Sequence, residues 1–149
     1  MNVGNLCRRK VIAVRRADEI TAAAELMRSN HIGYLVVVES DAGVERPVGV
    51  LTDRDIVVTV VARQTDPRTL RVGDVMTQQP ATVGEAESLD KAVREMRRIG
   101  VRRLPVVGQR GELVGILSMD EVLDALAGEL RDVAAAVHNE QRIECSLRP

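Results

Sequence analysis

Apolar and polar positions follow two different periods along the chain, and the period changes most clearly within residues 48–57. Residues 48–51 form an apolar run that predicts a buried strand, and residues 56–61 carry apolar side chains at helical spacing. Between them, Thr52 precedes Asp55 by three positions, which is typical of a helix N-terminus. We therefore expect a strand to pass directly into a helix at Thr52.

The same order of residues recurs in the second half of the chain. Ser118 precedes Glu121 just as Thr52 precedes Asp55. Corresponding residues lie 69 positions apart up to and including the middle strand of each copy, and 66 apart after it. The difference falls in a loop, where a change in length costs little. The sequence therefore contains a duplication.

Each copy is expected to fold as strand-helix-strand-strand-helix, an α+β arrangement. In the first copy we expect strands at residues 11–14, 34–38 and 48–51, and helices capped by Asp18 or Thr21 and by Thr52. In the second copy we expect a helical turn at 72–76, strands at 80–83, 101–107 and 113–117, and helices at 88–98 and 118–138. Neither sheet can bury both faces alone, so the copies should pack as a pseudo-two-fold pair.

These elements divide the chain into a first repeat at residues 8–66, a linker at 67–71 and a second repeat at 72–128. Residues 129–149 are expected to extend the last helix and then form a loose tail from 139 onward. Residues 1–10 are polar and partly basic, which predicts a frayed start or a short lead-in to the first strand.

Composition excludes several classes of protein. The 149 residues include 21 Lys+Arg and 22 Asp+Glu, so the net charge of -1 gives no basic field for nucleic acid. No apolar run approaches the roughly 20 residues that span a bilayer, and the start lacks a signal-peptide layout. Cys7 and Cys145 lie far apart without metal-ligand spacing, which favours a reduced cytoplasmic protein.

The duplicated pattern resembles a pair of CBS domains, the cystathionine-β-synthase type repeat also called a Bateman module. The motifs that carry the resemblance lie at residues 31–37 and 49–56 in the first copy, and at residues 75–77, 82–83, 100–107 and 115–118 in the second. The resemblance implies a regulatory module rather than an enzyme, with no catalytic residues. It also implies a homodimer and an adenosine ligand, such as AMP, ATP, NAD or S-adenosylmethionine, in clefts between the repeats.

Thr52 and Asp55 are the principal candidates for ligand binding. A carboxylate accepts hydrogen bonds from two neighbouring hydroxyls, so Asp55 suits a ribose diol, and free N–H groups at the helix start add donors. The same two residues also suit an ordinary capping box, which would stabilise the helix by ~1 kcal/mol without any ligand. The resemblance favours Asp55 as a ribose ligand.

Arg102 and Arg103 follow Val101 at the entry to a predicted strand. The resemblance implies that they contact the phosphates of a nucleotide held by the opposite repeat, and a guanidinium fork suits phosphate. Side chains alternate along a strand, so one of the two arginines is expected to face the cleft. A solvated basic face is the alternative. The resemblance also implies that Thr82 reads the adenine edge, where an ordinary strand residue is the alternative.

The equivalent candidates for a second site are Val11, Gly33, Tyr34, Ser118 and Glu121. The resemblance implies Asp or Asn where this chain has Glu121, which is longer by one methylene and is favoured in capping boxes. Gly33 and Tyr34 stand where the first site has arginines, so this cleft lacks their charge. We expect one good adenosine site and one that is altered or empty.

Other chemistry is not indicated. His31 and His138 lack cysteine or carboxylate neighbours at ligand spacing, so no metal site is predicted. Apolar residues on the last helix of each repeat, including Val61 and Leu126, exceed what one small sheet covers, which predicts self-association.

The function expected first is therefore an adenosine-nucleotide sensor that acts in signal transduction through a homodimer. The alternative is an adaptor that has lost ligand binding and docks an unidentified protein partner through its long last helix. An enzyme or a nucleic-acid binder ranks last, because the chain has neither a catalytic motif nor a net positive charge.

Overall fold

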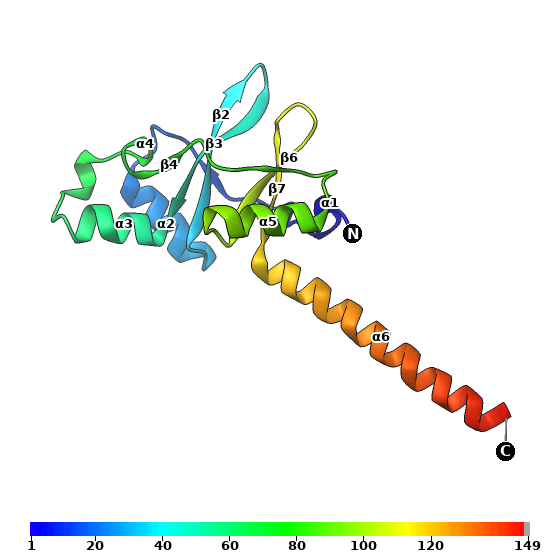
Figure 1. Ribbon diagram of the computed structural model, residues 1–149. Coiled ribbons are helices and arrows are strands. Elements are labelled where there is room, and N and C mark those ends of the chain that lie inside the picture. Colours follow the sequence, from blue (N-terminus) through cyan, green and yellow to red (C-terminus); the bar gives the residue numbers. More distant parts are fainter. Residues whose placement is uncertain (148–149) are drawn as a thin grey trace.

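The computed structural model describes residues 1–147, which form two similar lobes and one long helix that projects away from them (Figure 1). The first lobe contains β1 (Ala13–Val14), α2 (Ile20–Asn30), β2 (Tyr34–Asp41), β3 (Val44–Thr52), α3 (Asp53–Ile56) and the π-helical η1 (Val57–Val61). The second contains β5 (Val83–Gly84), α5 (Leu89–Ile99), β6 (Arg103–Val107), β7 (Leu113–Ser118) and α6 (Met119–Leu147). The α+β fold of two repeats is confirmed.

The two sheets share one topology. β1 pairs parallel with β2, which pairs antiparallel with β3, and β5, β6 and β7 repeat this order. The register shifts between Val37 and Val38 in the first sheet and between Val106 and Val107 in the second. These positions are 69 apart, so the duplication extends to the irregularities of the strands. A hairpin turn joins β6 to β7, with Gly111 at φ 78°.

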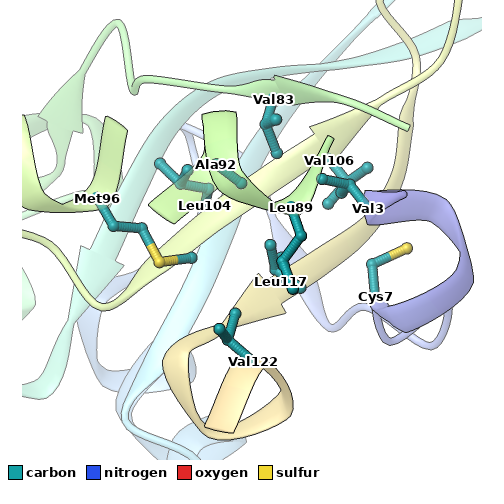
Figure 2. Packing of buried hydrophobic residues seen from close by; sticks show 10 residues of the cluster. All are labelled: Val3, Cys7, Val83, Leu89, Ala92, Met96, Leu104, Val106, Leu117 and Val122. Carbon is teal, nitrogen blue, oxygen red and sulfur yellow. The ribbon is translucent and has the colours of Figure 1, made fainter. Parts of the chain in front are cut away.

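Each lobe also holds the segment that precedes the other lobe in the chain. α1 (Val3–Leu6) places Val3 and Cys7 in the core of the second lobe, beside β7 and the start of α6 (Figures 1 and 2). α4 (Val72–Val75), which follows η2 (Pro67–Thr69), packs on the first lobe instead, and β4 (Thr77–Gln78) adds a fourth strand there by pairing with β3. The two segments are equivalent across the duplication.

The expectation of a frayed N-terminus is wrong for the segment that carries Val3 and Cys7. Val3 has no exposed surface and Cys7 has 8%. Both side chains are apolar and compact, so their burial stabilises the docked segment. The segment is too short for a periodic signal, but the order Val, Gly, two residues, then the second buried residue recurs at Val72 and Met76.

The segments that contain α1 and α4, which we call the exchanged segments, pass close to the backbone of β7 and β3. This close approach explains why glycine stands at equivalent places in these two strands. A Cβ on Gly49 would lie 2.5 Å from the Met76 sulfur. A Cβ on Gly115 would lie 2.8 Å from the Cys7 sulfur and within 2.9 Å of a backbone carbonyl oxygen. Only glycine leaves this space, so the duplicated glycine is a packing requirement of the exchange.

The helix that follows the first strand of each lobe ends at a residue with a positive φ angle. His31 closes α2 and Gly100 closes α5, both in the left-handed region, with φ of 54° and 72°. Ser88 caps the start of α5 by accepting a hydrogen bond from the Lys91 N–H at 3.3 Å. These ends orient the chain into β2 and β6, whose first residues border the clefts described below.

The start of α2 differs from the prediction, which placed its cap at Asp18 or Thr21. The N-cap is Glu19, and no side chain makes a capping hydrogen bond there. Asp18 instead accepts a hydrogen bond from the Arg15 N–H at 2.7 Å in the turn before the helix. A local Asx-type bond therefore uses the carboxylate that was expected to cap the helix.

The last helix, α6, is longer than predicted. The expectation of a loose tail from residue 139 is wrong for residues 139–147, which continue the helix; residues 148–149 lie outside the described part of the chain. No glycine or proline interrupts residues 129–147, and alanines at 134–136 favour the helix. Every side chain from residue 129 to 147 is exposed. Within residues 1–147, no helix combines the length and apolar character needed to cross a bilayer.

Candidate functional site

A cavity of about 1040 Å³ opens between the two lobes. Thr52 and Asp55, at the junction of β3 and α3, line one side, and Val101, Arg102 and Arg103, at the entry to β6, line the other. The volume matches the upper end of the range for small-molecule sites, which is about 300–1,000 Å³. The structure thus brings five of the residues proposed for the first site around one hollow, which we call cleft 1.

Thr52 and Asp55 form the capping box that their spacing predicts. The Asp55 N–H donates to Thr52 Oγ1 at 3.1 Å, and Asp55 Oδ2 accepts from the Thr52 N–H at 2.8 Å. Within residues 1–147, these bonds leave Asp55 Oδ1 without a hydrogen-bond partner. The half-buried carboxylate therefore caps α3 with one oxygen and retains the other for a donor in cleft 1.

Both Arg102 and Arg103 line cleft 1, whereas strand alternation predicted that only one would. The reason is that β6 begins at Arg103, so Arg102 lies in the bend before the strand and is not bound by its alternation. Both side chains are exposed, and within the described residues neither guanidinium forms a salt bridge. Two cations are therefore available to an anionic group in the cleft.

Thr82 lies outside cleft 1. Its side chain is exposed, and the neighbouring residues Pro80 and Ala81 line the cavity in its place. β5 begins only at Val83, so the strand expected at residues 80–83 starts late, and the position that the resemblance implied for Thr82 lies in the segment before the strand.

The last turn of α5 adds two residues that sequence reasoning missed, Glu95 and Arg98. Arg98 Nε donates to Glu95 Oε2 at 2.9 Å. This hydrogen bond from Arg98 holds the pKa of Glu95 below its usual range. The spacing of three on a helix signals such a pair, but the pattern is common on exposed helix faces and does not by itself indicate a cleft.

A second cavity, of about 260 Å³, is lined by residues that correspond to those of cleft 1 with the two repeats exchanged. We call it cleft 2. Gly33, Tyr34, Ser118 and Glu121 border it, as the sequence predicts, whereas Val11 does not and its neighbour Ile12 does. The late start of β1 accounts for this, as the late start of β5 does in cleft 1.

Glu121 uses its carboxylate differently from Asp55. Its Oε2 accepts hydrogen bonds from the Ser118 N–H, at 2.7 Å, and from the Ser118 hydroxyl. Its Oε1 is buried and forms an ion pair with the Arg8 guanidinium. Burial raises the pKa of Glu121, but the Ser118 hydrogen bonds and the charge of Arg8 outweigh it and hold the pKa below its usual range.

Tyr34 and Arg103 line both clefts and form the wall between them. Burial raises the pKa of the Tyr34 hydroxyl far above its usual range, despite the nearby charge of Arg103. The single tyrosine of a chain without Phe or Trp therefore stays a neutral phenol in the wall between the clefts. His31 also lines cleft 2, yet residues 1–147 contain no group of three potential metal ligands.

Comparison with known proteins identifies the family of the chain. A CBS domain model matches residues 3–62 and 72–128, and the two matches begin at the buried valines of the exchanged segments. An uncharacterized protein of Methanopyrus kandleri is 35% identical over 123 residues, which cover 83% of this chain and 61% of that protein. Hypoxic response protein 1 of Mycobacterium tuberculosis is 34% identical over 122 residues, with coverage of 82% and 78%.

Solved structures agree with these matches. The crystal structure of Hypoxic Response Protein I with two coordinated zinc ions has a TM-score of 0.73 and 31% identity, and it covers 83% of this chain and 98% of that one. A CBS domain protein from Pyrobaculum aerophilum complexed with AMP has a TM-score of 0.73 and 29% identity, with coverage of 81% and 89%. On the strength of its two matched repeats, the chain belongs to the CBS domain family.

Proposed function

We propose that the chain is a regulatory module that binds an adenosine nucleotide in cleft 1. One observation carries this proposal: a single cavity joins the half-buried carboxylate of Asp55 on one lobe to the guanidinium groups of Arg102 and Arg103 on the other. A nucleotide offers a hydroxyl pair at its ribose and an anion at its phosphate. The ribose hydroxyls donate to Asp55 Oδ1, and the phosphate lies by the arginines, away from the carboxylate that would repel it.

The adenine base lies between aliphatic side chains. Ala81, Ile99 and Val101 line cleft 1, and Tyr34 is the only aromatic residue there. Apolar walls with a few placed polar groups are typical of small-molecule sites. Pro80 and Ala81 line the cleft, and we propose that backbone groups beside them read the base edge, a role that the resemblance implied for Thr82.

The AMP complex of the Pyrobaculum aerophilum protein supports an adenosine ligand for this fold. AMP, ATP, NAD and S-adenosylmethionine are therefore titrated into the protein by calorimetry. The proposal predicts saturable heat with at least one of them, and no heat with any of the four at millimolar concentration contradicts it. Comparison of the dissociation constants of ATP and AMP also shows whether Arg102 and Arg103 favour a longer phosphate chain over a single phosphate.

Regulation follows from the position of the cleft between two lobes. A ligand that contacts both lobes favours the lobe arrangement that brings Asp55 and Arg102 to its two ends, and it shifts the population toward that arrangement. We propose that this shift is transmitted through a homodimer in signal transduction. The module itself is not a catalyst.

The dimer surface proposed for this chain is the exposed apolar stripe of α6. Apolar side chains with exposures of 45–70% recur at alternating spacings of three and four residues, at Leu123, Leu126, Leu130, Val133 and Val137. This spacing is typical of a helix that packs against another helix. A second copy of α6 carries the matching stripe, and its pairing covers apolar surface that a lone helix leaves in water.

A cytoplasmic location is proposed on the state of the cysteines. Cys7 and Cys145 are both free thiols, which is typical of a reducing compartment.

The second candidate function, an adaptor that binds a protein partner without nucleotide, is favoured by the exposed apolar stripe of α6. Partner capture that ignores nucleotide supports the adaptor, and capture that changes on addition of AMP supports the sensor.

A further inference from the structure

The two clefts are related by the duplication, so each residue of one has an equivalent in the other. Asp55 corresponds to Glu121, 66 positions on, and Arg8 corresponds to Thr77, 69 positions on. Strand pairing supports the second equivalence independently. Thr77 pairs with Val50 in β3, and Arg8 forms an isolated antiparallel bridge with Ile116, the counterpart of Val50 in β7.

Cleft 1 and cleft 2 differ at this pair of positions. Cleft 1 combines Asp55 with the short neutral side chain of Thr77 and has a volume of about 1040 Å³. Cleft 2 combines Glu121 with Arg8 and has a volume of about 260 Å³. The smaller volume lies below the range of typical small-molecule sites, which begins at about 300 Å³.

The two oxygens of the Glu121 carboxylate have different partners. Its Oε2 is occupied by both capping hydrogen bonds from Ser118, so Oε1 is the oxygen that remains. Among residues 1–147, the equivalent oxygen of Asp55 in cleft 1 has no hydrogen-bond partner, whereas the Arg8 guanidinium contacts Oε1 in cleft 2. The Glu121 side chain is 15% exposed and that of Arg8 is 76% exposed, so the arginine covers the carboxylate from the solvent side.

We infer that Arg8 is an internal occupant of cleft 2, which restricts the module to one adenosine ligand per chain. The cation contacts the carboxylate oxygen that a ribose hydroxyl needs, and Arg8 itself lines the cavity. A ribose hydroxyl would have to replace this attraction between opposite charges in order to reach Oε1. This inference rests on the proposed function of cleft 1.

Calorimetric titration with AMP tests the inference through the number of sites. The wild-type protein is expected to bind about one AMP per chain, and the double variant Arg8→Thr/Glu121→Asp, which copies cleft 1, about two, because each open cleft of this size holds one ligand. Arg9→Thr is the matched control. Arg9 is the adjacent cation, pairs with Glu85 at 3.0 Å and does not line cleft 2. Its removal is expected to leave the number of sites unchanged.

Adding Asp55→Asn to the double variant should weaken one of its two sites by about tenfold or more and leave the affinity of the site in cleft 2 unchanged. Two sites in the wild-type protein, or no additional site in a double variant that retains wild-type thermal unfolding, overturns the inference and leaves the proposed function of cleft 1 intact. Absence of binding to the wild-type protein contradicts the proposed function instead. A single site that then appears in the double variant still supports the role of Arg8.

Discussion

The guanidinium carbon of Arg103 lies 5.8 Å from the centroid of the Tyr34 ring, so a cation of the second repeat rests on the only aromatic side chain of the first. Both residues line both clefts. A cation–π contact of this kind contributes about 0.5–1 kcal/mol at exposed sites. The contact fixes the wall between the clefts and holds Arg103 where a phosphate in cleft 1 can reach it.

Arg103→Ala is therefore expected to weaken AMP binding. A hydrogen bond to a charged group contributes about 1.5–3 kcal/mol, which corresponds to roughly 10- to 100-fold in the dissociation constant. Arg97→Ala is the matched control, because Arg97 is exposed on the neighbouring α5 but does not line cleft 1. Equal affinities of the two variants for AMP in calorimetry would exclude Arg103 from phosphate binding.

The exchange of the N-terminal segment predicts that a residue near the start of the chain stabilises the second lobe. Val3 and Val72 are both fully buried, in opposite lobes, so Val3→Ala and Val72→Ala should each lower the free energy of unfolding by about 1–3 kcal/mol. Val58→Ala, at a position 48% exposed, should change it by less than about 0.5 kcal/mol. Urea unfolding measures all three, and an unchanged Val3→Ala protein would mean that the segment is undocked.

The duplication was the part of the fold that the sequence revealed best. Thr52 and Ser118 mark the same strand-to-helix junction, and the left-handed ends at His31 and Gly100 follow from residues with a known preference for helix termini. Such features are local, so residue type and spacing suffice to predict them.

Features that depend on contacts distant in sequence were not predictable in the same way. Val3 and Cys7 are buried by a lobe more than 75 residues away, and no periodicity marks so short a segment. Thr82 and Val11 were assigned to the clefts by the family resemblance, but β5 and β1 start later than the strands expected there. The contact of Arg8 with Glu121 likewise joins residues 113 positions apart.

Self-association through α6 is expected to depend on the apolar stripe rather than on the helix as a whole. Leu130 and Val133 are 70% and 63% exposed at the middle of the stripe. Leu130→Glu/Val133→Glu should convert the dimer to a monomer in light scattering, because it buries like charges between two copies. Ala135→Glu places the same charge on another face of α6 and should leave the dimer intact. A wild-type protein that is monomeric at high concentration contradicts this surface.

Glu121 predicts a specific pH dependence of stability. Its pKa in the folded protein is lower than its ordinary value of 4.5, so the folded state favours the charged carboxylate. The resulting stabilisation is fully present above pH 4.5 and is lost as the pH falls through the lowered pKa. The difference in unfolding free energy between the wild-type protein and Glu121→Gln should therefore be largest near neutral pH and shrink on acidification. A difference that does not change with pH would show that the charge of Glu121 contributes nothing.

The central claim, that the carboxylate of Asp55 holds a ligand as well as capping α3, is tested most directly by two matched asparagine variants. Asp55 and Asp74 accept the same capping hydrogen bond, each at 2.8 Å, but only Asp55 lines cleft 1. Asparagine keeps an oxygen acceptor for the cap and removes the charge. In AMP titrations, Asp55→Asn should raise the dissociation constant by about tenfold or more, whereas Asp74→Asn should leave it unchanged. Equal affinity of Asp55→Asn and the wild-type protein would reduce Asp55 to a helix cap and contradict the account.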